Sequence, residues 1–186
     1  MNLIELDIKG VFVVKMPVFS DERGSFQEIW NDASMSIPGF EGSFVQDNAA
    51  VSKRGVLRGL HYQLPFPQAK LVTALQGEVF DVAVDLRPES ATFGKWTGRT
   101  LVAGSGEALF VPTGFAHGYQ VTSETAHVFY KCSDVYHPEA EHALAWDDVD
   151  VNISWPLADP LVSAKDNAAL TFRQTRSLVS PLERHR

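Results

Sequence analysis

The stretch Gly55-Val56-Leu57-Arg58-Gly59-Leu60-His61-Tyr62-Gln63 combines β-forming residues with two glycines, an arginine and a histidine. Its apolar and aromatic side chains favour a strand, and glycine within a strand is typical of a place where another group approaches the backbone closely. A second stretch, Pro112-Thr113-Gly114-Phe115-Ala116-His117-Gly118, again places a histidine after a glycine-marked turn. His61 and His117 therefore predict one pocket built from distant strands.

The apolar pattern on either side of these stretches predicts an all-β fold. Alternation with a period of two residues indicates strands, and short glycine- and proline-containing turns separate them. Many short strands of this kind favour a β-sandwich or barrel of the jelly-roll class. A few short helices are expected, at Asn31–Ser36 and Leu161–Leu170. The predicted strands are Val11–Val14, Val56–Tyr62, Leu71–Leu75, Val79–Leu86, Ala108–Val111, Tyr119–Thr122 and His127–Cys132.

The length and composition fit one globular domain. The chain has 186 residues, of which 45% are hydrophobic and 21% charged, and a domain of this size buries a substantial core. Neither a repeat nor a low-complexity segment divides it. We therefore expect residues 1–186 to form a single domain, with an irregular tail that follows a proline-containing arm at Trp155–Pro160.

The charge and the cysteine content limit the classes of partner. A net charge of −7 argues against nucleic-acid binding, which needs a basic surface. No apolar run is long enough to span a membrane, and the N-terminal residues lack the basic and apolar regions of a signal peptide. The single cysteine, Cys132, fits a reducing compartment. These features predict a cytoplasmic protein without nucleic-acid or membrane partners.

The two histidine-containing stretches resemble the halves of the cupin signature, but the metal ligands are incomplete. In metal-binding cupins the first half supplies two histidines and a glutamate, and the second half supplies one more histidine, a set that suits a divalent transition metal. Here Gln63 replaces the second histidine and Lys70 occupies the glutamate position. A lysine ammonium repels a cation and has no lone pair to offer. We therefore expect no metal, and a pocket suited to an anion.

His61 is a candidate general base, because histidine accepts protons near neutral pH. The alternative is a histidine whose hydrogen bonds are satisfied inside a β core. Arg58, Lys70 and His117 are plausible neighbours, and burying so many polar groups without a function is costly. These neighbours favour the catalytic interpretation.

A catalytic histidine needs an acceptor that orients its other ring nitrogen. Asp81 and Asp85 alternate to one face of an otherwise apolar strand, and Asp166 is a third candidate. Spacing alone favours a helix cap or a solvated turn for Asp166. Tyr130 could donate a proton, or it could simply fill the β core. The residues by themselves leave these alternatives open.

Motifs along nearly the whole chain resemble those of the dTDP-4-dehydrorhamnose 3,5-epimerase family, a metal-free branch of the cupins. Agreement at so many separated sites is specific, and the resemblance implies a cupin jelly roll, no cofactor and a homodimer. The matching segments are Asp21–Glu28, Phe44–Asn48, Gly55–Gln63, Lys70–Val72, Asp81–Asp85, Pro112–Gly118, Tyr130-Lys131 and Ser163–Asp166.

The resemblance also implies a reaction and a set of catalytic residues. The substrate would be dTDP-4-dehydro-6-deoxy-D-glucose, inverted at C3 and C5 to dTDP-4-dehydro-L-rhamnose, a precursor for polysaccharides such as O-antigen. His61 would be the base, with Asp166 as its partner and Asp81 as a further partner. Tyr130 would be the proton donor on the opposite face of the ring, and Lys70 would stabilise the enolate oxygen.

The substrate-binding residues that the resemblance implies fall into two groups. Three are expected near the pyrophosphate or the sugar, namely Arg23, Arg58 and His117. The others are Phe19, Phe26, Glu28, Gln46 and Asn48 around the nucleoside, Tyr136 stacking on the base, and Lys165. In similar proteins the N-terminal region contributes to the neighbouring subunit's site, which would place Arg23 and Glu28 in the partner's pocket.

One departure and three rival functions accompany the resemblance. Ala50 stands where the family usually has a serine, which removes one hydrogen bond near the nucleotide. An epimerase that acts on a single carbon shares the same motifs. A cupin that binds a nucleotide sugar without converting it would not need both His61 and Tyr130. A metal-dependent cupin oxygenase or isomerase would need the metal ligands that are missing here.

Overall fold

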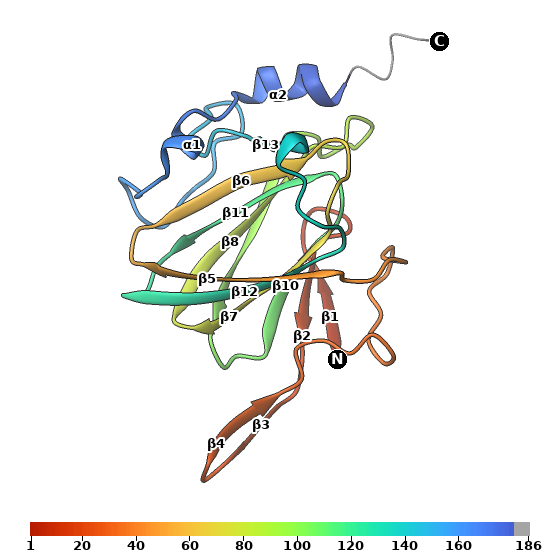
Figure 1. Ribbon diagram of the computed structural model, residues 1–186, viewed down its shortest axis with the longest axis vertical. Coiled ribbons are helices and arrows are strands. Elements are labelled where there is room, and N and C mark those ends of the chain that lie inside the picture. The colour runs from red at the N-terminus through yellow and green to blue at the C-terminus, as the bar shows by residue number, and fades with distance from the viewer. Residues whose placement is uncertain (181–186) are drawn as a thin grey trace.

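The computed structural model describes residues 1–180 as two antiparallel β-sheets, a projecting hairpin and short helices (Figure 1). The six-stranded sheet has the order β1 (Asn2–Glu5), β2 (Phe12–Lys15), β10 (Glu107–Val111), β7 (Lys70–Gln76), β12 (Thr125–Cys132) and β5 (Gln46–Lys53). The five-stranded sheet has the order β13 (Glu141–Ala143), β6 (Leu57–Gln63), β11 (Phe115–Val121), β8 (Glu78–Asp85) and β9 (Trp96–Val102). This arrangement is the all-β cupin jelly roll that the sequence predicts.

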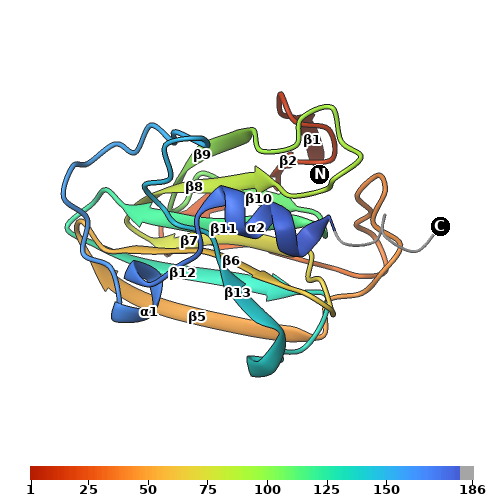
Figure 2. The same ribbon diagram turned by 90° about the horizontal axis from the view of Figure 1, so that it is seen from above.

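The main core lies between the two sheets, which are stacked face to face in Figure 2. Successive side chains of a strand point to opposite faces, so Val72 of β7 packs in this core while Leu71 packs on the outer face of its sheet. On the facing sheet, Ala83 points inward and Val82 points outward. Both faces of these central strands are therefore buried.

Two irregular segments cover the outer faces of the sheets. Trp30, Ile37 and Phe40 pack on the six-stranded sheet, whereas Trp155 and Phe172 pack on the five-stranded sheet. The helix α2 (Phe172–Val179) lies across this second face in Figure 2. Residues 1–180 contain no helix with the length and apolar character needed to cross a membrane.

All seven strands expected from the sequence are present, as β2, β6, β7, β8, β10, β11 and β12. The missed strands are β1, β5, β9 and β13, which lie at sheet edges, and the pair β3 (Val18–Asp21) and β4 (Gly24–Gln27). An edge strand faces solvent along much of its length, so its sequence lacks the apolar alternation of a central strand.

The helix predictions need correction. Asn31–Ser36 contains a single turn, in which Ala33 N–H bonds to Asn31 Oδ1 and Met35 N–H bonds to Asn31 O. The turn does not continue as a helix, and the nearby Pro38 disfavours the helical conformation at Ile37. Leu161–Leu170 contains only the four-residue helix α1 (Ala164–Asn167). The expected irregular tail includes α2, and its last residues, 181–186, lie outside the described residues. A short 3-10 helix, η1 (Pro138–Ala140), precedes β13.

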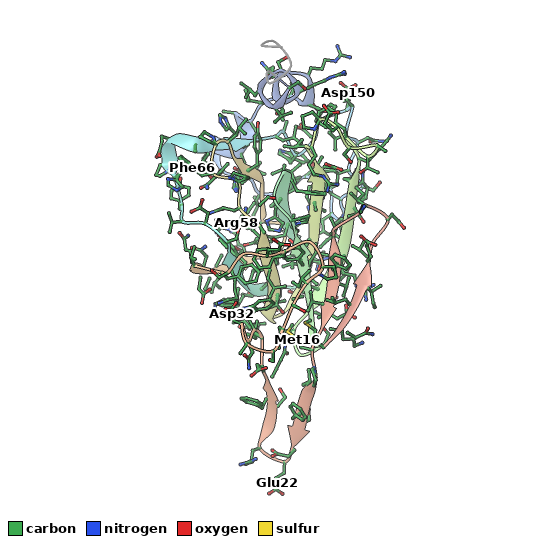
Figure 3. The ribbon with its side chains drawn as sticks, turned by 90° about the vertical axis from the view of Figure 1, so that its right-hand side faces the viewer. Met16, Glu22, Asp32, Arg58, Phe66 and Asp150 are labelled. Atoms are coloured by element: carbon green, nitrogen blue, oxygen red, sulfur yellow. The ribbon has the colours of Figure 1, made fainter. Side chains whose placement is uncertain are left out.

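The hairpin β3–β4 extends away from the body of the molecule. Figure 3 places Glu22 at its tip, at the opposite end of the molecule from Asp150. Phe19 and Phe26 are directly opposite each other in the hairpin, and their side chains are 63% and 69% exposed. Aromatic side chains this exposed on a projecting arm are typical of an interaction surface.

Candidate active site

A cavity of about 470 Å³ opens between the two sheets. Two smaller cavities, of about 360 and 240 Å³, also reach His61 and Lys70, so these two side chains stand where the three cavities meet. The polar residues that line the largest cavity are Arg58, His61, Lys70, His117, Tyr119, Tyr130, Tyr136, Glu141, Ser163, Lys165 and Asp166.

The close approach of β6 and β11 brings the two predicted histidines together. His61 and His117 are direct partners in the antiparallel register. A Cβ atom on Gly59 would lie only 2.6 Å from Gly118 Cα, and Gly59 has a φ of +134°, so this crossing requires glycine. The register shifts between His117 and Tyr119, and this irregularity lets Arg58 and His61 line the same cavity although they are three residues apart.

His61 pairs with Asp166. The distance from His61 Nε2 to Asp166 Oδ1 is 2.7 Å, and the Asp166 side chain is 5% exposed. Ser163 caps α1 by accepting a hydrogen bond from Asp166 N–H, so the serine is the helix cap and the aspartate is free to face the barrel. Burial is the largest single influence on Asp166 and would raise its pKa, but the hydrogen bond and the charge of His61, with hydrogen bonds from Ser163 and Gly59, together lower this pKa.

Asp81 pairs with His117, which corrects the expectation that it contacts His61. The distance from His117 Nε2 to Asp81 Oδ1 is 2.7 Å, and both side chains are buried. Tyr119, the next inward residue of β11, is the register partner of Asp81. Asp85, the other candidate on β8, binds Arg87 outside the cavity. The barrel thus contains two histidine–aspartate pairs with the same distance.

Lys70 and Tyr130 approach the cavity from the six-stranded sheet, opposite the histidines. Burial lowers the pKa of Lys70, although the charges of Cys132, Asp81 and Glu141 act in the opposite direction. Burial raises the pKa of Tyr130, so this phenol stays protonated at neutral pH. The cavity therefore has a histidine on one wall, and a phenol and a cationic amine on the other.

Two further cavity residues, Glu141 and Tyr119, were missed by the sequence reasoning. Glu141 accepts hydrogen bonds from Tyr136 Oη at 2.5 Å and from Lys165 Nζ. Tyr119 Oη has no hydrogen-bond partner within residues 1–180, and burial raises the pKa of Tyr119 to about 12. Glu141 lies on a three-residue edge strand, and Tyr119 has the signal of an ordinary core aromatic, so neither stands out in the sequence.

Polar side chains of β5 extend the site into the adjoining cavity of about 240 Å³. Gln46 and Asn48, on β5, hydrogen-bond to each other, and Gln46 Oε1 accepts a hydrogen bond from Tyr136 N–H. Arg58 Nε donates to Ser52 Oγ at 3.1 Å. Together with Lys165, these groups offer donors and acceptors to a polar ligand that occupies the two adjoining cavities.

The remaining predicted binding residues do not line any of these three cavities. Phe19, Arg23 and Phe26 lie on the hairpin β3–β4, where Arg23 forms an ion pair with Asp21. Glu28 follows the hairpin and accepts a hydrogen bond from Asn31. Within one chain, the structure separates these four residues from the other predicted binding residues (Figure 1).

The donor set does not match a cupin metal site. Across the described part of the chain, no three histidine, cysteine, aspartate or glutamate side chains are grouped as metal binding requires. Gln63, at the position of a cupin ligand, uses its amide to bind Phe66 O and His137 N–H. Lys70 presents a cationic donor, which is unable to ligate a metal ion.

Comparisons with known proteins find one family of epimerases that matches most of the chain. A family model described as dTDP-4-dehydrorhamnose 3,5-epimerase matches residues 5–174. The dTDP-4-dehydrorhamnose 3,5-epimerase of Methanothermobacter thermautotrophicus is 47% identical over 168 residues, which cover 89% of this chain and 91% of that protein. That of Pseudomonas aeruginosa is 48% identical over 174 residues, which cover 92% and 96%.

Solved structures of epimerases are also similar to this chain. The dTDP-6-deoxy-D-glucose-3,5-epimerase of Legionella pneumophila, in complex with dTDP-4-keto-L-rhamnose, superposes with a TM-score of 0.92 at 42% identity and covers 96% of both chains. A 3'-monoepimerase from Streptomyces bikiniensis, in complex with dTDP-quinovose, has a TM-score of 0.85 at 34% identity and covers 93% of this chain and 89% of its own.

Proposed function

Because the chain belongs to the dTDP-4-dehydrorhamnose 3,5-epimerase family, we propose that it inverts both C3 and C5 of dTDP-4-dehydro-6-deoxy-D-glucose without a cofactor. The product is dTDP-4-dehydro-L-rhamnose. One observation carries the proposal: the His61–Asp166 pair and Tyr130 line one cavity from opposite sheets, with Lys70 between the cavities that meet there.

His61 removes the hydrogen next to the ketone. A C–H bond beside a carbonyl is acidic only if the enolate that forms is stabilised. The negative charge of Asp166 orients the imidazole and stabilises the imidazolium that forms when His61 accepts the proton. The Lys70 ammonium offers a positive charge to the enolate oxygen in a site that is shielded from water.

Tyr130 returns a proton to the opposite face of the ring. Inversion needs deprotonation on one face and reprotonation on the other, so the base and the acid must flank the sugar. Tyr130 stands on β12 and His61 on β6, in the two facing sheets. Burial keeps the Tyr130 phenol protonated, so it can act as the acid. Between the two inversions the His61 imidazolium releases its proton and the Tyr130 phenolate takes one up, by exchange with solvent.

The other polar residues hold the nucleotide. Arg58 and His117 serve the pyrophosphate or the sugar, and their cationic or donor groups account for anion binding by a chain whose net charge is −7. The remaining binding residues, which line the two adjoining cavities, are Gln46, Asn48, Tyr136 and Lys165. Tyr136 is 50% exposed, which leaves its ring free to stack on the thymine.

The hairpin β3–β4 completes the site of a second copy in a homodimer. Its exposed aromatic residues Phe19 and Phe26, with Arg23 and Glu28, have the chemistry of a nucleotide contact but lie away from the cavity of their own chain. Exchange of this arm between two copies would bring them to the partner's nucleotide. The free, buried thiol of Cys132 supports the cytoplasm as the place of action.

Incubation of the substrate with enzyme in deuterated water tests this function. Each inversion takes its new hydrogen from solvent, so mass spectrometry should find two deuterium atoms in the sugar, and NMR should place them at C3 and C5. One deuterium would assign the chain to the single-carbon epimerases, to which it is also similar. No uptake would leave a protein that binds nucleotide sugars without converting them. His61→Ala provides the inactive control.

A further inference from the structure

The segment Ser133–His137 joins β12 to η1 without regular secondary structure, yet it carries Tyr136 to the cavity. An irregular segment of this kind is ordinarily mobile, since few backbone bonds restrain it. Here the backbone is held by side chains from other elements. Three glutamines provide most of these bonds, namely Gln46, Gln63 and Gln68.

Gln63 is the most deeply placed of the three. It ends β6, is 6% exposed, and lies two residues from His61. Its Oε1 accepts a hydrogen bond from His137 N–H at 2.9 Å, and its Nε2 donates to Val135 O at 3.3 Å and to Phe66 O at 2.8 Å. One buried amide thus binds the backbone on both sides of Tyr136.

The other contacts fix the rest of the segment. Gln46 Oε1 accepts from Tyr136 N–H at 2.8 Å, and Gln68 Nε2 donates to Asp134 O at 2.8 Å. The Tyr136 ring is then held through its hydroxyl by Glu141, which stands opposite Gln63 in the pairing of β13 with β6. The backbone and the ring are therefore both tied to the end of β6.

We propose that Gln63 is a positioning residue that sets Tyr136 in place before the nucleotide arrives. This inference rests on the function proposed above, in which Tyr136 faces the base. A ligand that must order a mobile segment loses affinity, and a segment ordered in advance avoids that loss. Gln63, where a metal-binding cupin has a histidine ligand, thus has a role in nucleotide affinity. It acts through Tyr136 and does not touch the reacting carbons.

Gln63→Leu removes these hydrogen bonds at nearly constant volume. The Kd for dTDP, measured by calorimetry, should rise by about tenfold, the effect of losing the net stabilisation of one or two neutral hydrogen bonds. The KM for the nucleotide sugar should rise to a similar extent, while kcat stays within about threefold. A fall in kcat at unchanged Kd would overturn the proposal.

Gln120→Leu is the matched control. Gln120 is fully buried, and its amide likewise bonds to the N–H and the C=O of an irregular segment, in this case at Leu157. Its loss should lower the melting temperature without raising the Kd for dTDP tenfold. Equal rises in Kd for Gln63→Leu and Gln120→Leu would mean general destabilisation and would overturn the proposal.

A double-mutant cycle with Tyr136→Ala separates this inference from the proposed function. If Gln63 acts through Tyr136, the double variant should bind dTDP as weakly as Tyr136→Ala alone. Additive losses would show that Gln63 acts elsewhere and overturn the inference, while the deuterium uptake that tests the function would remain. Should Gln63→Leu fail to fold, Gln63→Glu replaces it, because it keeps the acceptor for His137 N–H and loses both donated bonds.

Discussion

Replacement of Asp166 by asparagine should slow proton abstraction at both carbons. The carboxylate lies 2.7 Å from His61 Nε2 and is 5% exposed, whereas the imidazole is 30% exposed, so water screens the pair in part. A hydrogen bond to a charged group contributes about 1.5–3 kcal/mol. Because His61 gains positive charge as it takes the proton, this stabilisation acts on the transition state, and about 1.4 kcal/mol corresponds to a factor of ten in rate. We therefore expect about a 10- to 150-fold loss.

The rate of deuterium uptake from solvent measures this step directly, apart from product release. Asp81→Asn is the matched comparison, because its pair with His117 has the same 2.7 Å distance and is at least as buried. It should lower the uptake rate by less than tenfold, since the partner of His61 remains. Equal losses in the two variants, or an Asp166→Asn rate within twofold of the wild type, would refute the assignment of His61–Asp166 as the base.

Two other predictions concern Lys70 and the hairpin. Burial lowers the pKa of Lys70, so kcat should fall with rising pH below the ordinary lysine value of 10.5, as the ammonium is lost. In Lys70→Arg this decline of kcat should move to higher pH or disappear. An active Lys70→Arg variant whose kcat declines at the same pH as that of the wild type would contradict the role of Lys70. For the hairpin, the variants Arg23→Ala and His61→Ala should each be nearly inactive alone. When the two are unfolded and refolded together, about half of the dimers are mixed and each mixed dimer has one intact site, so about a quarter of wild-type activity should return. No recovery would mean that Arg23 serves its own chain.

The central strands and the principal site residues could be predicted from the sequence. Strands such as β8 are buried on both faces, so most of their residues are apolar, and this pattern predicts a strand from the sequence alone. Gln63 and Lys70 stand where metal-binding cupins have ligands, and the chemistry of their side chains argued against a metal site. The edge strands and α2 were missed because their side chains are mostly polar, so packing against the barrel determines their structure.

The partner of His61 shows the limit of sequence reasoning. By residue type Asp81, Asp85 and Asp166 were equally plausible acceptors, and spacing argued against Asp166. The resemblance to the family, and not the local pattern, named Asp166 as the partner. In the structure Asp85 binds Arg87, Asp81 binds His117, and Asp166 reaches His61 across 105 positions of the chain. Hydrogen bonds between residues that are distant in the chain form only when the strands and the segments that follow them pack together.

The sequence by itself determined which chemical groups are available: a histidine, a phenol, a lysine at a former metal position, and glycines that permit close crossing of strands. Their identity follows from residue type and local pattern. Only the tertiary structure decided that Asp81 serves His117 and not His61, and that Glu141 joins the site. Those facts depend on the antiparallel register of β6 with β11 and on the packing of two sheets, which long-range contacts determine.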